Sequence, residues 1–201
     1  MCGIVGYVGS QQAAPILLDG LSKLEYRGYD SAGLAVRNGT EETEVIKAKG
    51  RLKVLAEKTN NGTAVPGTCG IGHTRWATHG EPSENNAHPH MSDDGNVVAV
   101  HNGIIENYQE LKNKLLRKGY TFYSETDTEV AVKLIDYYYK KYEGTPVDAI
   151  NHSLVRILQF PHTAPRPQPP YAAAPTKRPA SARGTPAPRC RRRTRGHSPR
   201  P

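Results

Sequence analysis

The sequence of 201 residues is poor in cysteine: its three cysteines, Cys2, Cys69 and Cys190, stand at spacings that match no metal or redox motif. So small and odd a number argues against a disulfide framework and favours a reducing compartment. The sequence also lacks an apolar run long enough to cross a bilayer. Its first residues lack the basic segment and long apolar stretch of a secretory signal. We therefore expect a cytoplasmic protein without a membrane partner.

Acidic residues are missing from residues 161–201, which hold ten Lys or Arg and eleven of the sixteen prolines. That segment also lacks Ile, Leu, Val, Phe and Trp, so it cannot bury enough apolar surface to offset its conformational entropy. The sequence therefore predicts a disordered Pro/Arg-rich tail over 159–201. Residues 1–160 carry 17 basic and 19 acidic side chains, and we expect no nucleic-acid binding there. The arginines of 189–195 either bind a nucleic acid by counterion release or are merely solvated.

The first 158 residues are long enough for one domain with a sizeable core. Apolar periodicity and turn signals predict a mixture of strands and helices. The predicted strands are 4–8, 34–36, 44–47, 96–100 and 120–123, and the predicted helices are 11–26, 50–58, 108–118, 130–141 and 145–158. Cys69, two residues before the core-like Ile71, is expected to be a buried small residue.

A cysteine follows the initiator methionine directly, so removal of Met1 would make Cys2 the N-terminal residue. Its thiol and a free α-amine would then belong to one residue. The α-amine has a pKa of roughly 7.7–8.0, so near neutral pH it can accept a proton and serve as the base for the nucleophilic thiolate. The alternative is that Cys2 is a small apolar residue at the start of a core strand.

Residues 73–90 contain the only tryptophan and four of the eight histidines, with little apolar periodicity. That composition favours a functional loop over a core element. Arg75 beside Trp76 suggests a bidentate fork for a carboxylate under an aromatic cover. The alternative is a metal site, whose candidate ligands are His73, His79, His88 and His90. Neither a helical i, i+4 pair nor a nearby cysteine supports a metal, and we expect none.

Asn102 and Gly103 follow a predicted strand, where such a pair is first of all a turn signal. The same pair offers the side-chain amide and the closely approaching backbone N–H of an oxyanion hole. Asp127 lies in a Ser/Thr/Glu run that suits helix N-capping, and the alternative is that it faces a ligand ammonium. Arg27, between two tyrosines, is either a surface residue or a charge held near the cysteine.

Five stretches in this order closely resemble one family. They are residues 1–7 (MCGIVGY), 25–33 (EYRGYDSAG), 72–80 (GHTRWATHG), 101–107 (HNGIIEN) and 124–129 (SETDTE). They resemble the N-terminal glutaminase domain of the glutamine–fructose-6-phosphate aminotransferases (glucosamine-6-phosphate synthases), a class II glutamine amidotransferase. The resemblance covers about residues 1–157. It implies an α+β fold, the four-layer αββα sandwich of the N-terminal-nucleophile hydrolases, with the cysteine at the end of a central strand.

The resemblance also implies a role for each matching residue. Cys2 would attack the side-chain amide of L-glutamine and form a glutamyl thioester, while Asn102 and the Gly103 N–H would stabilise the oxyanion. Arg27 would order the cysteine site. The residues expected to bind glutamine are Arg75 at its α-carboxylate, Asp127 at its α-ammonium, Thr78 and His79 completing the pocket, and Trp76 as the gate to an ammonia channel. No metal or organic cofactor is implied.

The sequence departs from the family pattern near Ile157, where it turns rich in Pro, Arg and Ala, as a frameshifted reading of a GC-rich gene does. We expect a truncated glutaminase domain over 2–158, an incomplete sandwich, and the tail over 159–201. The family's sugar-isomerase domains, which bind fructose 6-phosphate, are absent from the sequence, and full-length relatives are expected to be homo-oligomers. Exposed strand edges and apolar faces should lower stability. The alternative is an inactive truncated product with a basic, non-specifically anion-binding tail.

Overall fold

Strand β1 (Gly3–Val8) begins directly after Cys2 and lies at one edge of a four-stranded antiparallel sheet, in the order β1-β4-β2-β3. The other strands are β2 (Ser31–Arg37), β3 (Glu44–Lys49) and β4 (Cys69–Arg75). The computed structural model describes residues 2–25, 28–39, 42–77, 80–142 and 144–158. They all fall in the first of two units, residues 1–162, and the predicted tail over 159–201 lies outside them. Within the described residues β1 has one paired edge, so it is not the central strand that the resemblance implied.

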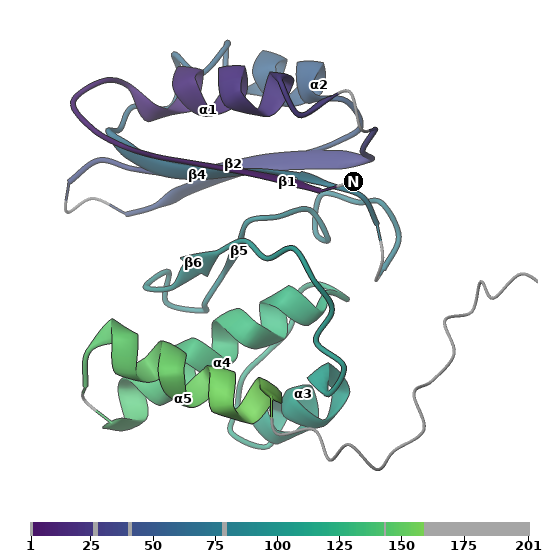
Figure 1. The fold of residues 1–201 in the computed structure, drawn as a ribbon, viewed down its shortest axis with the longest axis vertical. Helices are drawn as coiled ribbons and strands as arrows, with labels where there is room; N and C mark the ends of the chain where they lie inside the picture. Colours follow the sequence, from purple (N-terminus) through teal and green to yellow (C-terminus); the bar gives the residue numbers. More distant parts are fainter. Residues whose placement is uncertain (1, 26–27, 40–41, 78–79, 143, 159–201) are drawn as a thin grey trace, which may run out of the picture. The chain divides into compact units, whose positions relative to one another are not determined.

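Helices α1 (Ala13–Ser22) and α2 (Leu52–Lys58) cover one face of this sheet (Figure 1). The predicted helix over 11–26 is shorter because its buried stripe runs from Ala13 to Leu21. Gly20 lies inside α1 where a Cβ atom would come within 2.8 Å of Val5 in β1, so the glycine allows the helix to approach the sheet closely. The core between them contains Leu17, Leu21, Leu34, Val36 and Leu55.

The opposite face of the sheet meets a second set of elements, in which a small sheet lies between β1–β4 and three helices (Figure 1). This sheet pairs β5 (His90–Met91) with β6 (Val98–Ala99). The helices are α3 (Tyr108–Leu116), α4 (Asp127–Tyr142) and α5 (Pro146–Leu158), whose shared core includes Leu111, Leu115, Val130, Leu134 and Tyr138. The order of layers is helix, sheet, sheet, helix, which confirms the αββα class, with a second sheet of only two short strands in the described residues.

The segment before α4 is not the strand that the sequence predicted over 120–123. Its backbone is held by a side chain instead: Glu129 accepts the N–H groups of Tyr123 and Ser124 at 3.0 and 2.8 Å. Glu129 in turn lies 3.1 Å from the ammonium group of the fully buried Lys133, which also donates to Asp93 at 2.7 Å. This network fixes the first turns of α4, and with them the position of Asp127.

Two other expectations about the strands are wrong. The predicted strand over 96–100 is reduced to β6, whose two residues are only half-buried. Cys69 is exposed rather than buried, because it opens β4 opposite Val8, which is 81% exposed at the end of β1. None of the helices in the described ranges is long and apolar enough to span a membrane.

Candidate active site

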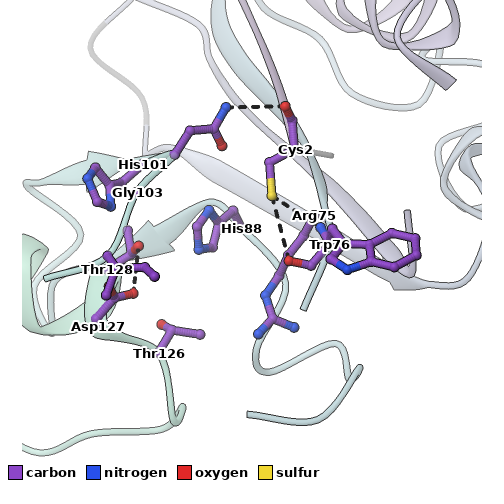
Figure 2. Close-up of a pocket in the computed structure, with 11 residues that line it drawn as sticks. Cys2, Arg75, Trp76, His88, His101, Gly103, Thr126, Asp127 and Thr128 are labelled. Atoms are coloured by element: carbon purple, nitrogen blue, oxygen red, sulfur yellow. Dashed lines mark hydrogen bonds between the residues drawn. The ribbon is translucent and has the colours of Figure 1, made fainter. Parts of the chain in front are cut away.

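A cavity of about 400 Å³ lies between the start of β1, the end of β4 and the N-terminus of α4. Its walls are formed by Cys2, Arg75, Trp76, His88, His101, Asn102, Gly103, Ile104, Thr126, Asp127 and Thr128. Figure 2 shows these side chains around the cavity, with the sulfur of Cys2 beside the backbone of Trp76. Seven residues that were singled out separately in the sequence, His88 among them as a candidate metal ligand, therefore line one cavity.

The pairing of β1 with β4 brings the cysteine to this cavity. Gly3 is opposite Thr74 in the antiparallel register, so Cys2 lies beside the residues that follow β4. The Trp76 N–H donates to Cys2 Sγ at 3.2 Å, and Sγ lies 3.7 Å from the Trp76 carbonyl oxygen. Cys2 is half-buried, so its sulfur is held by the backbone and still borders the cavity.

The side chain of Asn102 lies beside the cysteine. Its Nδ2 donates to the Cys2 carbonyl oxygen at 3.4 Å, and its Oδ1 is 2.7 Å from Nε2 of His73. Gly103 follows in the cavity wall, where a Cβ atom would come within 2.8 Å of the His101 ring. Because Gly103 has no side chain, its backbone forms this part of the cavity wall.

Arg75 brings a buried positive charge to the cavity. The side chain is 4% exposed, its Nη1 is 4.0 Å from the Asp30 carboxylate, and its Nη2 donates to the Gly80 carbonyl oxygen at 3.4 Å. Burial lowers the pKa of Arg75, while the nearby carboxylates of Asp30 and Asp127 oppose the shift. A guanidinium remains protonated in proteins, so Arg75 presents a cation.

Asp127 brings a carboxylate to the same cavity, at the first residue of α4. Its Oδ2 accepts the Ile105 N–H at 2.8 Å, and its Oδ1 lies 3.5 Å from the Thr128 hydroxyl. Arg75 and Asp127 extend from different walls of the cavity in Figure 2. A cation and a carboxylate in a space of about 400 Å³ suit a small zwitterion such as an amino acid.

Trp76 is 53% exposed, although it borders the cavity. Gly28, with a φ of +70°, lies beneath the indole, and a Cβ atom there would be 3.3 Å from Cζ3 of Trp76. The remaining predicted site residues, Arg27, Thr78 and His79, lie outside the described residues. The α-amine of Cys2 is bonded to Met1, which lies outside them as well.

Sequence reasoning missed several side chains around the cavity. His101, Ile104, Thr126 and Thr128 line it without having been assigned a role, and His88 lines it although it was considered only as a metal ligand. Sequence reasoning also treated 73–75 as loop, whereas these residues close β4 and are buried. Because side chains alternate along a strand, His73 and Arg75 face the second layer, and Thr74 faces the side of α1.

Asp30 was missed too, although it lies in one of the five recognised stretches. Its carboxylate accepts the Ala77 N–H at 2.5 Å and faces the Arg75 guanidinium. An aspartate just before a predicted strand was the signal that could have indicated this supporting role.

Three buried histidines form a column beside the cavity. The ring of His88 lies between those of His73 and His90, with centroid distances of 4.3 and 4.8 Å. Burial lowers the pKa of His73 to about 4, and it also lowers the pKa values of His88, to about 2, and of His90. The described residues include no group of His, Cys, Asp and Glu side chains arranged to hold a metal ion. Adjacent rings of the column contact each other at interplanar angles of 44° and 73°.

Comparison with known proteins agrees with this geometry. Residues 58–143 match the glutamine amidotransferase domain family. The glutamine–fructose-6-phosphate aminotransferase of Caldanaerobacter subterraneus is 58% identical over 158 residues, and that of Clostridium tetani is 62% identical over 160 residues. Each match covers 78% of this chain and 25% of the relative, so the chain spans about a quarter of the length of the curated relatives it matches.

Solved structures of amidotransferases have the same fold. The glutamine phosphoribosylpyrophosphate amidotransferase of B. subtilis, complexed with ADP and GMP, superposes with a TM-score of 0.64 at 29% identity. A structure described as the allosteric regulatory enzyme of purine biosynthesis gives a TM-score of 0.64 at 30% identity. Both cover 78% of this chain and 33% of the other chain. The chain therefore belongs to the glutamine amidotransferase domain family, with the N-terminal-nucleophile fold, and is similar to the N-terminal part of the glutamine–fructose-6-phosphate aminotransferases.

Proposed function

We propose that this chain releases the amide nitrogen of L-glutamine through a thioester on Cys2. One observation carries the proposal: the sulfur of Cys2, the amide of Asn102 and the opposite charges of Arg75 and Asp127 border a single cavity of about 400 Å³. A nucleophile, an oxyanion donor and two groups for an amino acid's charged ends are the parts that an amide-cleaving site needs.

The reaction starts once Met1 has been removed and Cys2 has a free α-amine. The α-amine takes the thiol proton, and Sγ forms a bond to the side-chain carbonyl carbon of glutamine while the carbonyl electrons move to oxygen. The Asn102 amide, 3.4 Å from the Cys2 carbonyl oxygen, and the Gly103 N–H stabilise that negative oxygen. When the C–N bond breaks, the α-ammonium returns the proton to the nitrogen, and ammonia leaves a glutamyl thioester. Water then attacks the thioester, and glutamate is released.

The charged groups of the cavity orient the substrate for this attack. We assign Arg75 to the α-carboxylate of glutamine and Asp127 to its α-ammonium, because each lines the cavity with the opposite charge. Trp76 lies partly exposed at the same cavity and is assigned to the gate toward an ammonia channel. The parts of Arg27, Thr78 and His79, in ordering the cysteine site and completing the pocket, are proposed from the resemblance alone.

The further fate of the ammonia is proposed from the relatives. Their name gives fructose 6-phosphate as the acceptor, and this chain spans about a quarter of their length. We assign fructose 6-phosphate to isomerase domains outside this sequence, so the chain by itself would hydrolyse glutamine to glutamate and ammonia without a metal or organic cofactor. We also propose a truncated glutaminase domain over 2–158 before the Pro/Arg-rich residues 159–201, a cytoplasmic location, no membrane or nucleic-acid partner for residues 1–160, and homo-oligomers for full-length relatives.

Release of glutamate from glutamine tests the proposal, with Cys2→Ala as the decisive variant and Cys69→Ala as its matched control. Cys69 is exposed at the far end of β4 and outside the cavity, so its loss should leave turnover unchanged. Cys2→Ala should abolish turnover. Equal turnover by the two variants would contradict the assignment of the nucleophile. A cooperatively folded, Met1-free wild type that releases no glutamate would favour the alternative, an inactive truncated product.

A further inference from the structure

His73 is a buried side chain that reaches the oxyanion donor without bordering the cavity. It lies in β4, is fully buried, and its Nε2 is 2.7 Å from Oδ1 of Asn102. The two ends of the Asn102 amide are chemically opposite, because Nδ2 donates hydrogen bonds and Oδ1 only accepts them. The Asn102 amide stabilises an oxyanion next to Cys2 only if Nδ2 faces it. A rotation of the amide by half a turn would place Oδ1 against the negative oxygen and repel it.

The surroundings of the ring decide which nitrogen carries hydrogen. Burial lowers the pKa of His73 to about 4, so near pH 7 the ring is neutral and has one N–H. Among the described residues Nδ1 of His73 has no hydrogen-bond partner, whereas Nε2 faces Oδ1 of Asn102. Hydrogen on Nδ1 would leave a buried N–H without an acceptor and set two lone pairs against each other at Nε2. The favourable tautomer therefore has hydrogen on Nε2, which is the donor that Oδ1 requires.

The sheet connects this donor rigidly to the nucleophile. His73 is opposite Ile4 in the pairing of β4 with β1, only two residues from Cys2, and opposite Gly33 in the pairing with β2. Its ring also packs against that of His88, with the two centroids 4.3 Å apart. Asn102, in contrast, lies in a segment between β6 and α3 that forms neither strand nor helix. The hydrogen bond therefore connects Asn102 to β4. β4 in turn pairs with β1, which begins directly after Cys2.

We propose that His73 is a positioning residue whose Nε2–H holds Oδ1 of Asn102, so that Nδ2 faces the oxygen that becomes negative during attack by Cys2. The inference rests on the proposed glutaminase function for its catalytic consequence. The contact itself rests on the geometry of β4 and the Asn102 segment.

Kinetics of glutamine hydrolysis separate positioning from a merely structural role. His73→Leu removes the donor, and because loss of one oxyanion donor costs about 10²–10³-fold in kcat, a misaligned one should cost roughly 10–100-fold, with KM changed less than about twofold. His73→Gln places an amide N–H near the position of Nε2 and should restore most of kcat. His90→Leu is the matched control: it removes a buried histidine from the same column whose ring contacts Thr126 and Tyr123 instead of Asn102.

His90→Leu should lower the melting temperature and leave kcat within about twofold, because the oxyanion donors are intact. Equal losses of kcat in His73→Leu and His90→Leu, without recovery in His73→Gln, would overturn the positioning role. An aldehyde analogue of glutamine adds a second comparison, because its thiohemiacetal oxygen occupies the oxyanion position. His73→Leu should weaken the aldehyde by the same factor as kcat and leave the affinity for L-glutamate unchanged.

A readout that needs no turnover distinguishes failure of this inference from failure of the proposed function. Nitrogen-15 NMR of the histidine rings should show hydrogen on Nε2 of His73, with a hydrogen-bond coupling to the Asn102 side chain that disappears in Asn102→Ala. Hydrogen on Nδ1 would overturn the inference whatever the activity. If the Nε2–H signal and its coupling are present while the Met1-free chain hydrolyses no glutamine, the contact stands and the proposed function fails.

Discussion

The two halves of the described structure differ in how completely their apolar faces are covered. In the sheet half, β1–β4 with α1 and α2, half of the residues of α1 are buried. In the helical half, β5–β6 with α3–α5, the last helix buries only Ala149 and Ser153, while Val147 is 63% and Leu158 is 75% exposed. An apolar stripe of this kind marks a surface that is usually covered by other protein. The chain spans about a quarter of the length of the curated relatives it matches.

The site draws on both halves. Cys2 and Arg75 come from the sheet half, whereas Asn102 comes from the segment before α3 and Asp127 from the first residue of α4. The histidine column lies where they meet, because His73 belongs to β4 and His90 to β5. The proposed reaction therefore requires that the helical half remain packed against the sheet β1–β4.

Acidification is expected to have the largest effect, because it charges the column between the halves. A buried histidine with a lowered pKa binds fewer protons folded than unfolded, so its stability contribution is complete above about pH 6.5 and falls as the pH drops toward the folded pKa. With folded pKa values of about 4 for His73 and about 2 for His88, each should cost roughly 3 kcal/mol of unfolding free energy between pH 6.5 and pH 4. Urea unfolding at a series of pH values measures this loss. His88→Phe should flatten the dependence, and an unchanged slope in that variant would contradict the buried, neutral column.

A core truncation in each half sharpens the comparison. Leu17 is fully buried between α1 and the sheet, so Leu17→Ala should lower the free energy of unfolding by about 2–5 kcal/mol through lost burial and a cavity. Leu154→Ala in α5 removes a side chain that is 47% exposed and should cost less than about 1 kcal/mol. Urea denaturation of both variants provides the test, and equal losses would show that α5 is as well covered as α1.

Charge removal at the start of α4 tests the contribution of the helical half to binding. Asp127→Asn retains the size of the side chain and removes the partner proposed for the α-ammonium, so kcat/KM for glutamine should fall by about 10–100-fold, or about 1.4–2.7 kcal/mol. The control is Asp148→Asn at the start of α5, where the carboxylate accepts hydrogen bonds from the N–H and the hydroxyl of Thr145 and lies outside the cavity. A loss of the same size in the control would contradict a specific role for Asp127.

The smallest effect on stability is expected from charges placed on the exposed stripe of α5. Val147→Lys and Leu158→Lys replace side chains that are already mostly in contact with water, so the free energy of unfolding should change by less than about 0.5 kcal/mol. Self-association should decrease, because the apolar stripe is interrupted. Sedimentation velocity at several concentrations measures it. If neither substitution changes the self-association, the surface responsible for it lies outside the exposed stripe of α5.

Sequence patterns predicted the elements whose packing is local. The stripe of α1 follows from residue spacing, and β2 and β3 follow from the turn signals before them; all three elements form with shorter or longer ends than expected. The prediction failed where a side chain, and not a neighbouring strand, accepts the backbone hydrogen bonds. Glu129 takes the N–H groups of Tyr123 and Ser124, so no strand forms there. His73 and Arg75 looked like loop residues because a strand that buries polar side chains against a second layer lacks the usual apolar alternation.

The candidate site could be predicted as far as the recognised stretches reach. Cys2, Arg75, Trp76, Asn102, Gly103 and Asp127 all border the cavity that the structure contains. His88 lies in none of these stretches, and its place depends on how the segment before β5 folds onto the sheet. Thr126 lies in the stretch 124–129, but only the folded structure places it at the cavity. The contact between His73 and Asn102 spans 29 residues and becomes visible only in the structure.

The central claim is that both halves assemble a working cysteine site despite the uncovered face of α5. Intact-mass spectrometry after incubation with a diazo-ketone analogue of glutamine tests it most directly, with Cys69→Ala and Cys2→Ala measured in parallel. The account predicts a single adduct on the chain that lacks Met1, mapped to Cys2, retained in Cys69→Ala and absent from Cys2→Ala. A Met1-free wild-type chain that forms no adduct at Cys2 would contradict it.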